Sequence, residues 1–533
     1  MSSKTLYLKS TVKMEPLINS WYAWSFLVSP LTFSLLCKKL HLRVLDSYLK
    51  APAHHKKALN NKAMKGGLFL DYGGELEDVK LFRDSTIDNL SELLKLADQI
   101  QQASIWLSEN ADGRSLAELY NDLPEFLSGR VELAYDLFNH ANLRFIEPLF
   151  YSSNLYMPEL QSLSFSHHIG DDRPFVLSSP RLPNSKNVIA TKSFCDSDND
   201  QLFAMRYEPQ NLHFVQKYFR WDELDKAQRD LLMSFFTEDL PECCREPIAE
   251  NVAVRVRYFG HATVLLETGS VSIMTDPIIS YDQGSGEERY SFKDLPEKID
   301  YVVLTHNHQD HVMLETLLQV RHKVGSIVVP RCSGGSLHDP SLKLMLEALG
   351  FKNVIDLSEM ESIQISGGLI RGLPFLGEHG DLNILTKLAF NIELEGQSFL
   401  FAADSNNLDP SLYNNLQSII GDIDHIFIGM ECEGAPMSWL YGPLYHKALE
   451  RRHDITRRLD GSNSDKAYEL VKVFNPKSVY VYAMGAEPWL TFISSIDYVE
   501  SSAPIVESDR LIDKCISDGV IAERLYGLKQ IDL

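Results

Sequence analysis

The chain has 533 residues, of which 44% are hydrophobic and 23% are charged, as in ordinary globular proteins. Because a single hydrophobic core stops growing at roughly 250–300 residues, we expect at least two domains. The net charge of −22 argues against non-specific binding to nucleic acid or anionic membranes, except through a local basic patch. Seven cysteines without a C-x-x-C pair indicate free thiols and a cytoplasmic location.

The first notable segment is the stretch between Glu15 and Lys38, which contains no charged residue. Its length would suit a membrane span, but Asn19, Thr32, Pro30 and four serines dilute its apolar character. We therefore expect a buried segment or a dimer contact, and no membrane association.

The rest of the N-terminal half predicts a mixture of helices and irregular structure. Apolar residues recur at intervals of three and four from about residue 85 to 150, and again over 221–236, which indicates helices. Residues 240–251 contain two prolines and several charges, as is typical of a linker. We therefore predict a separate α+β N-terminal domain over residues 1–245.

After the linker, short apolar strands alternate with helices. This order predicts an α/β layered domain over residues 251–533. The predicted strands cover 252–260, 262–268, 271–276, 300–305, 326–330, 389–396, 397–404, 426–430 and 478–484, and the predicted helices cover 311–324, 340–350 and 464–474.

The sequence THNHQDH (305–311) joins one of these strands to a helix. It places His306, His308, Asp310 and His311 within six positions, on a loop held by a buried strand. His306 and His308 can converge on one ion, while Asp310 and His311 can turn toward a second, which is the arrangement of a two-metal site. The alternative is a polar loop whose histidines cap a helix.

The cluster resembles the His-x-His-x-Asp-His signature of the metallo-β-lactamase superfamily, and the resemblance covers roughly residues 250–500. It includes the hairpin YFGHATVLLETGSVSIMTDP (258–277) and Asp404 in FLFAADS. It implies an αββα sandwich for residues 251–533, with Asp404 as the carboxylate that bridges both metals. His261 and Asp276 are then either hydrogen-bond partners of the ligands or structural residues.

Two positions depart from the pattern of the superfamily's hydrolases. That pattern has another histidine in the loop PFLGEHGD (374–381), where Glu378 and His379 are adjacent, and we favour Glu378 as the ligand. It has a last histidine where Ala483 stands. Either another residue fills this position, and we favour Glu431, or one metal keeps an open coordination site. Further candidates for that last position are His425, His446 and His453.

Carboxylates in place of imidazoles favour iron or manganese over zinc. In this respect the chain resembles the metallo-β-lactamase-fold diiron β-hydroxylases of nonribosomal peptide (antibiotic) pathways. The resemblance implies one iron on His306, His308 and Glu378, the other on Asp310 and His311, and Asp404 on both. Glu378 and Asp404 are thus the residues expected to govern catalysis.

The resemblance also implies an activity and partners. The activity is O₂-dependent monooxygenation at the β-carbon of an amino acid tethered as a thioester to a carrier domain of a nonribosomal peptide synthetase. Electrons are expected from an external reductase or electron-transfer protein, and the N-terminal domain is expected to form a homodimer and control substrate access. The basic run 447–458 is a candidate docking surface for the acidic carrier, or simply a solvated helix face.

Two other functions are compatible with the same residues. A dinuclear zinc or manganese hydrolase would act on a lactone, phosphodiester or amide through a metal-bound hydroxide. A scaffold that keeps the fold for partner binding would need no metal, which the nearly complete ligand set disfavours.

Overall fold

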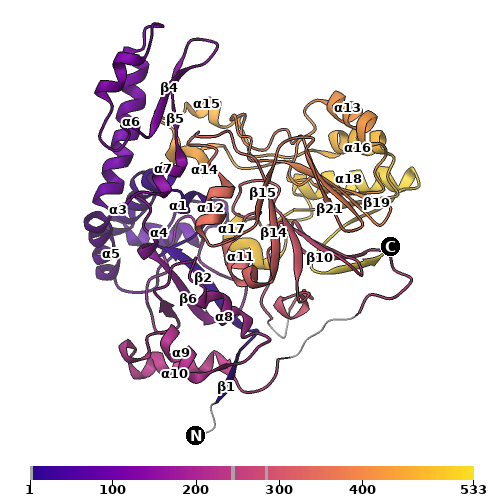
Figure 1. Ribbon diagram of the computed structural model, residues 1–533, viewed down its shortest axis with the longest axis horizontal. Helices are drawn as coiled ribbons and strands as arrows, with labels where there is room; N and C mark the ends of the chain where they lie inside the picture. Colours follow the sequence, from indigo (N-terminus) through magenta and orange to yellow (C-terminus); the bar gives the residue numbers. More distant parts are fainter. Residues whose placement is uncertain (1–3, 242–246, 283–285) are drawn as a thin grey trace.

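The structure is a computed structural model that describes residues 4–241, 247–282 and 286–533 (Figure 1). Two facing β-sheets form the C-terminal half, and the N-terminal half, coloured indigo to magenta, covers one side of them. Within the described ranges, no helix combines the length and the apolar character needed to cross a bilayer.

The first sheet of the C-terminal domain has seven strands in the order β15-β14-β13-β12-β11-β10-β23. Strands β12 to β15 are parallel, whereas β23, β10 and β11 are antiparallel additions. The bounds are β10 (Arg255–Gly260), β11 (Thr263–Glu267), β12 (Ser272–Thr275), β13 (Ile299–Val303), β14 (Val324–Pro330), β15 (Val354–Leu357) and β23 (Lys529–Asp532).

The second sheet also has seven strands, in the order β16-β17-β18-β19-β20-β21-β22. Strands β16 to β19 are antiparallel, and β19 to β22 are parallel. The bounds are β16 (Ser362–Ile365), β17 (Gly368–Leu373), β18 (Ala389–Leu394), β19 (Gln397–Phe401), β20 (His425–Gly429), β21 (Ser478–Tyr482) and β22 (Ile521–Arg524).

Apolar side chains from both sheets meet in one buried cluster, which includes Val264, Phe390 and Phe427. The outer face of the second sheet packs on α13 (Pro410–Ile420), α16 (Ser464–Phe474) and α18 (Ala503–Ser517). The outer face of the first sheet packs on α11 (Leu314–Val320) and α12 (Leu342–Ala348). The domain is therefore the expected αββα sandwich.

The N-terminal domain is mixed. Its largest sheet has the order β3-β2-β6-β7, and a smaller one has the order β8-β1-β9. The strands are β1 (Thr5–Leu8), β2 (Val12–Ile18), β3 (Trp21–Tyr22), β6 (Gln161–His167), β7 (Val188–Ala190), β8 (Gln210–Asn211) and β9 (Phe236–Thr237). The helices are α1 (Ser25–Val28), α2 (Pro30–Leu36), α3 (Leu42–Lys50), α4 (Pro52–Leu59), α5 (Leu76–Asn89), α6 (Ser91–Asn110), α7 (Glu147–Tyr151), α8 (Asp198–Ala204), α9 (Leu212–Tyr218) and α10 (Lys226–Ser234).

The uncharged stretch of the N-terminal half is buried, as predicted. It runs through β2, β3, α1 and α2, and every residue from Trp21 to Cys37 is buried. These residues share one hydrophobic cluster with α11, α12 and Trp489 of the C-terminal domain. The two domains therefore pack through a common apolar interface. Their predicted boundary near residues 245–251 stays a prediction, and residues 242–246 lie outside the described ranges.

One prediction for this half was wrong in part. The helical region expected over 85–150 contains α5 and α6, but residues 117–122 form a short 3₁₀ helix, and β4 (Val131–Tyr135) pairs with β5 (Ala141–Phe145) as a hairpin. The apolar spacing of this short segment fits both helix and strand, and pairing between the two strands decides the outcome.

Candidate metal centre

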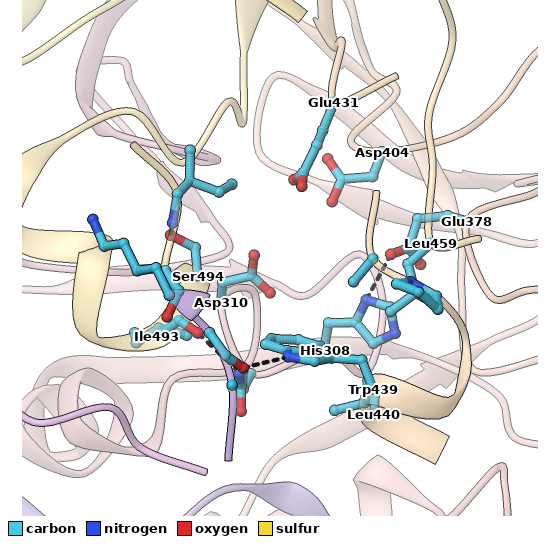
Figure 2. A pocket seen from close by; sticks show the side chains of 18 of the residues that line it. His308, Asp310, Glu378, Asp404, Glu431, Trp439, Leu440, Leu459, Ile493 and Ser494 are labelled. Atoms are coloured by element: carbon cyan, nitrogen blue, oxygen red, sulfur yellow. Dashed lines mark hydrogen bonds and ion pairs between the residues drawn. The ribbon is translucent and has the colours of Figure 1, made fainter. Parts of the chain in front are cut away.

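The polar residues singled out in the sequence gather at one edge of the sandwich. His306 to His311 follow β13, Asp404 follows β19, and Glu431 follows β20. Because these parallel strands end at the same edge, the loops after them converge there. Glu378 comes from the loop between β17 and β18 and points into the same space (Figure 2).

The first group of possible ligands consists of His306, His308 and Glu378, which are all buried. His308 Nδ1 lies 2.8 Å from Glu378 Oε1, and His306 Nε2 lies 3.8 Å from Glu378 Oε2. Two imidazole nitrogens and a carboxylate thus surround one point.

A second group lies beside it. His311 Nε2 is 2.9 Å from Asp404 Oδ2, and the same oxygen is 3.8 Å from His306 Nε2. Asp404 therefore lies between the two groups, as a bridging carboxylate would. Asp310 points into the same space from the opposite side (Figure 2).

Glu431 completes the oxygen-rich side, with its carboxylate next to that of Asp404 (Figure 2). Burial, together with the nearby charges of Asp404 and Asp310, raises the pKa of Glu431 well above its usual range. Like charges this close, without a cation, force one carboxylate to hold a proton.

Hydrogen bonds fix which nitrogen of two histidines faces the centre. The Thr305 hydroxyl donates to Asp276 Oδ2 at 2.6 Å, so it can accept from His306 Nδ1 at 3.0 Å. His311 Nδ1 lies 2.8 Å from the same Asp276 oxygen. Both rings therefore carry their proton on Nδ1 and leave Nε2 free as a ligand. Asp276 is thus a positioning residue for both.

His261 has the opposite tautomer. Its Nδ1 accepts a hydrogen bond from the backbone N–H of Gly485 at 3.1 Å, so the proton of the neutral ring is on Nε2. That Nε2 lies 3.5 Å from Asp310 Oδ2. In this tautomer the Nε2–H of His261 faces Asp310 without forming a hydrogen bond, although His261 lies close enough to Asp310 and His311 to form a ligand group with them.

Sequence reasoning missed one contact of the site. The Tyr441 hydroxyl, from α14 (Ser438–Tyr441), lies 2.8 Å from His308 Nε2. If Nδ1 of His308 binds metal, its Nε2–H donates to Tyr441, which then holds the ring in place. Nothing near Tyr441 in the sequence indicated this, because the two residues are 133 positions apart.

Glu378 and His379 are both buried at the centre but differ in their roles. Glu378 faces His306 and His308, whereas His379 Nδ1 lies 2.7 Å from Glu378 Oε2 and its ring stacks on His308. Burial opposes ionisation of Glu378, but His308 and His379 lower its pKa to about 2. The carboxylate is therefore ionised and available as a ligand.

The other candidates for the last ligand position lie elsewhere. His425 bonds Ser478 and Gln397 at the start of β20, His446 lines a different cavity, and His453 is exposed on α15 (Arg451–Asp454). Ala483 is buried, and its N–H donates to the His261 carbonyl. Among these candidates, only Glu431 reaches the cavity of the metal centre.

The backbone at the site is strained. His261, Asp276, Glu378, Ala403 and Ala483 all have positive φ angles, between 33° and 66°. Such conformations cost roughly 1–3 kcal/mol each in residues other than glycine, and they persist where the surroundings impose them. Their concentration around one point indicates a functional centre.

The residues fit a pair of divalent cations. His306 Nε2 and Asp404 Oδ1 are buried without a hydrogen-bond partner, although each is a metal-ligand atom. Unpaired buried polar atoms are costly, so a bound ion is the simplest partner for them. Four carboxylates, those of Asp310, Glu378, Asp404 and Glu431, also match the charge of two divalent ions.

The centre opens onto a cavity of about 540 Å³. Its walls include Trp439, Leu459 and Ile493, and an N-terminal loop that contains Met64 and Phe69 closes one side. The indole N–H of Trp439 donates to the Gly66 carbonyl at 2.9 Å and so fastens this loop to α14. A substrate in the cavity would contact both domains.

Known proteins resemble this chain in both halves. Residues 7–240 match the family described as the diiron non-heme β-hydroxylase N-terminal domain, and residues 255–429 match the β-lactamase superfamily domain. The 4-amino-L-phenylalanyl-[CmlP-peptidyl-carrier-protein] 3-hydroxylase of Streptomyces venezuelae is 36% identical over 525 residues, which cover 97% of this chain and 98% of that protein.

The similarity to solved structures also extends over both domains. The crystal structure of CmlA, a diiron β-hydroxylase from Streptomyces venezuelae, aligns over 100% of both chains with a TM-score of 0.93 and 35% identity. A metal-dependent hydrolase of Bacillus licheniformis is 25% identical, over 32% of this chain and 70% of the hydrolase. Because the hydroxylase is similar through both domains, the chain belongs to the family of diiron non-heme β-hydroxylases.

Proposed function

We propose that this hydroxylase acts on the β-carbon of an amino acid that is bound as a thioester to the carrier domain of a nonribosomal peptide synthetase. The observation that carries the proposal is the carboxylate-rich centre, with Glu378 where the hydrolase pattern has one histidine and Glu431 as the replacement for the histidine that is missing at Ala483. The relative from Streptomyces venezuelae is named for an aminoacyl group on a peptidyl carrier protein, which supports a tethered substrate.

The proposed ligands of the two irons follow from the contacts. His306, His308 and Glu378 would hold one ion, Asp310, His311 and Glu431 the other, and Asp404 both. Carboxylate oxygens suit iron, and a pair of iron ions supplies O₂ activation for oxygen transfer into a C–H bond. One oxygen atom enters the β C–H bond, and the other leaves as water, which requires two electrons and two protons from an external donor.

The protein's own contribution is positioning. Trp439, Leu459 and Ile493 give the cavity apolar walls that exclude water and hold the aminoacyl group beside the centre. Asp276 and Tyr441 fix the imidazoles through the hydrogen bonds described above. The loop with Met64 and Phe69 limits access from solvent.

The test combines metal analysis with turnover. Protein purified without added metal should contain about two iron ions per chain, and the reduced protein should add 16 Da to an aminoacyl-loaded carrier domain under O₂. A panel of carriers loaded with different amino acids identifies the substrate. Stoichiometric zinc, with hydrolysis of a lactone or phosphodiester and no hydroxylation, would support a hydrolase instead.

Further parts of the proposal concern partners. We expect a separate reductase or electron-transfer protein as the donor, a homodimer formed through the N-terminal domain, and a cytoplasmic location. Light scattering of the purified protein tests the dimer. Reconstitution of turnover with a ferredoxin and its reductase, compared with a chemical reductant, tests the donor.

A further inference from the structure

A basic segment of the N-terminal domain runs to the edge of the metal cavity. Between Asp46 and Asp71 the sequence has five lysines and no acidic residue, in a chain of net charge −22. The segment includes the end of α3, all of α4 and the loop that follows. Its lysines, all exposed, are Lys50, Lys56, Lys57, Lys62 and Lys65.

The end of this segment forms part of the cavity mouth. Met64 and Lys65 line the cavity, and the neighbouring Gly66 carbonyl accepts the hydrogen bond from Trp439. Gly66 has φ +76°, and a Cβ there would lie 3.2 Å from Ser495 Cβ on the facing loop. The basic segment is therefore held against the opening through which a substrate would enter.

Most of its charge is not neutralised by neighbours. Lys62 and Lys65 lie 3.7 Å and 3.6 Å from Asp497, an exposed pair of contacts that contributes little. Within the described ranges, Lys50, Lys56 and Lys57 form no ion pair with an acidic side chain. They are thus available to an acidic partner.

The basic run 447–458, which the sequence suggested, is less suited to docking. The side chains of Arg457 and Arg458 donate to the backbone carbonyls of Gly380 and Gly434, and Arg452 pairs with Glu450 at 2.7 Å. No residue of this run lines the metal cavity. Its arginines partly serve to hold the loops near Glu378 and Glu431.

We propose that residues 50–65 form the docking surface for the acidic carrier domain, an inference that rests on the proposed function. A tethered thioester reaches only as far as its flexible arm, so the carrier must sit at the cavity mouth. Opposite charge at that place guides the carrier and raises its association rate, while the rest of this acidic chain repels it. The other basic run, 447–458, reaches the cavity only through Arg458, which pairs with the wall residue Pro436 and whose guanidinium donates to the Gly434 carbonyl.

Two double variants test the location. Lys56→Glu with Lys57→Glu reverses two exposed charges outside the cavity wall, and Arg451→Glu with Arg452→Glu is the matched control. Two measurements are made: binding of a phosphopantetheinylated carrier domain by titration, and kcat/KM for the same aminoacyl group on the carrier and on free pantetheine. Light scattering checks that both variants keep the oligomeric state of the unmodified protein.

In the lysine variant, we expect the ratio of kcat/KM for the carrier to that for the pantetheine thioester to fall about ten-fold at low ionic strength. Carrier affinity should fall in parallel, the effect should shrink as salt is added, and the arginine variant should change less. An unchanged ratio and affinity in the lysine variant, or a larger loss in the arginine variant, would overturn the location. If the unmodified protein hydroxylates neither thioester, the proposed function fails, whereas the binding titration still decides the docking surface.

Discussion

The two halves of the proposed metal centre differ in their proposed ligands and in the side chains that hold those ligands. The first half has two imidazoles and Glu378, and its outer contacts are the neutral hydroxyls of Tyr441 and Thr305 and the His379 ring. The second half has one imidazole and two carboxylates, Asp310 and Glu431. Its outer contacts are the Asp276 carboxylate and His261.

This difference suggests that the two halves depend on different residues for metal binding and catalysis. Imidazoles offer one nitrogen each in a fixed direction, whereas carboxylates can bind through one or two oxygens. A charged hydrogen-bond partner also holds its ligand more strongly than a neutral one. We therefore expect the second half to depend heavily on its outer contacts, and the first half to depend more on Glu378 itself.

The largest effect should come from the residue that belongs to both halves. Asp404→Ala removes the carboxylate between His306 and His311, so the iron content should fall from about two ions to fewer than one. Hydroxylation should fall by more than the roughly 100-fold that loss of an outer contact costs. Elemental analysis and turnover measure both. Asp422→Ala, on an exposed loop before β20, is the control and should change neither. If Asp404→Ala kept two iron ions, Asp404 would not be the ligand that joins the two halves.

The next largest effect should distinguish Glu378, the proposed ligand of the first half, from its neighbour His379. Glu378→His should keep metal, since an imidazole is usual at this position in the superfamily, yet lose most hydroxylation. An imidazole cannot change from one-atom to two-atom binding when the substrate arrives. His379→Ala should be milder because His379 contacts Glu378 and belongs to none of the groups of converging ligand atoms among the described residues.

Iron content and hydroxylation of the loaded carrier are measured for both variants. If Glu378→His hydroxylated normally and His379→Ala lost iron, His379 rather than Glu378 would be the metal ligand. The first half would then consist of three imidazoles, and the contrast between the halves would become sharper.

These particular residues also show what the sequence could and could not reveal. The HNHQDH cluster could be singled out because its ligand-type residues are close in sequence and follow an apolar strand, and the structure brings them together. Ala483 could be singled out because it falls at a strand end. Tyr441 and the loop with Met64 reach the centre only through the tertiary fold. The hairpin formed by β4 and β5 was misread because a short apolar pattern fits two periodicities.

A smaller effect is expected from the charged outer contact. Asp276→Asn keeps the shape of the side chain but removes the charge that faces His311 Nδ1 at 2.8 Å. Loss of such a partner typically weakens metal binding by roughly 10–100-fold. Because Asp276 reaches His306 only through Thr305, the second ion should be lost first. Anaerobic titration with Fe(II), fitted to two sites, measures this. Equal weakening of both sites would show that Asp276 serves the whole centre.

The smallest effect should come from the neutral contact of the first half. Tyr441→Phe removes the hydroxyl 2.8 Å from His308 Nε2 but leaves the ring, which is buried beside Phe26 of the N-terminal domain. A neutral hydrogen bond contributes about 0.5–1.5 kcal/mol, so iron affinity at the first site should fall by about ten-fold or less.

The same Fe(II) titration, with a Mössbauer spectrum of the loaded protein, gives the affinity of each site and shows which iron environment changes. Tyr445→Phe is the matched control, because its hydroxyl lies near Met437 and Arg457 rather than near a proposed ligand. If Tyr441→Phe weakened iron binding more than Asp276→Asn, the neutral contact would be the stronger one, since both side chains keep their shape in these variants. The first half would then depend more on its outer contact than the second half does, which is the reverse of the expected order. The position of His308 would in that case depend on the packing of the two domains around Tyr441.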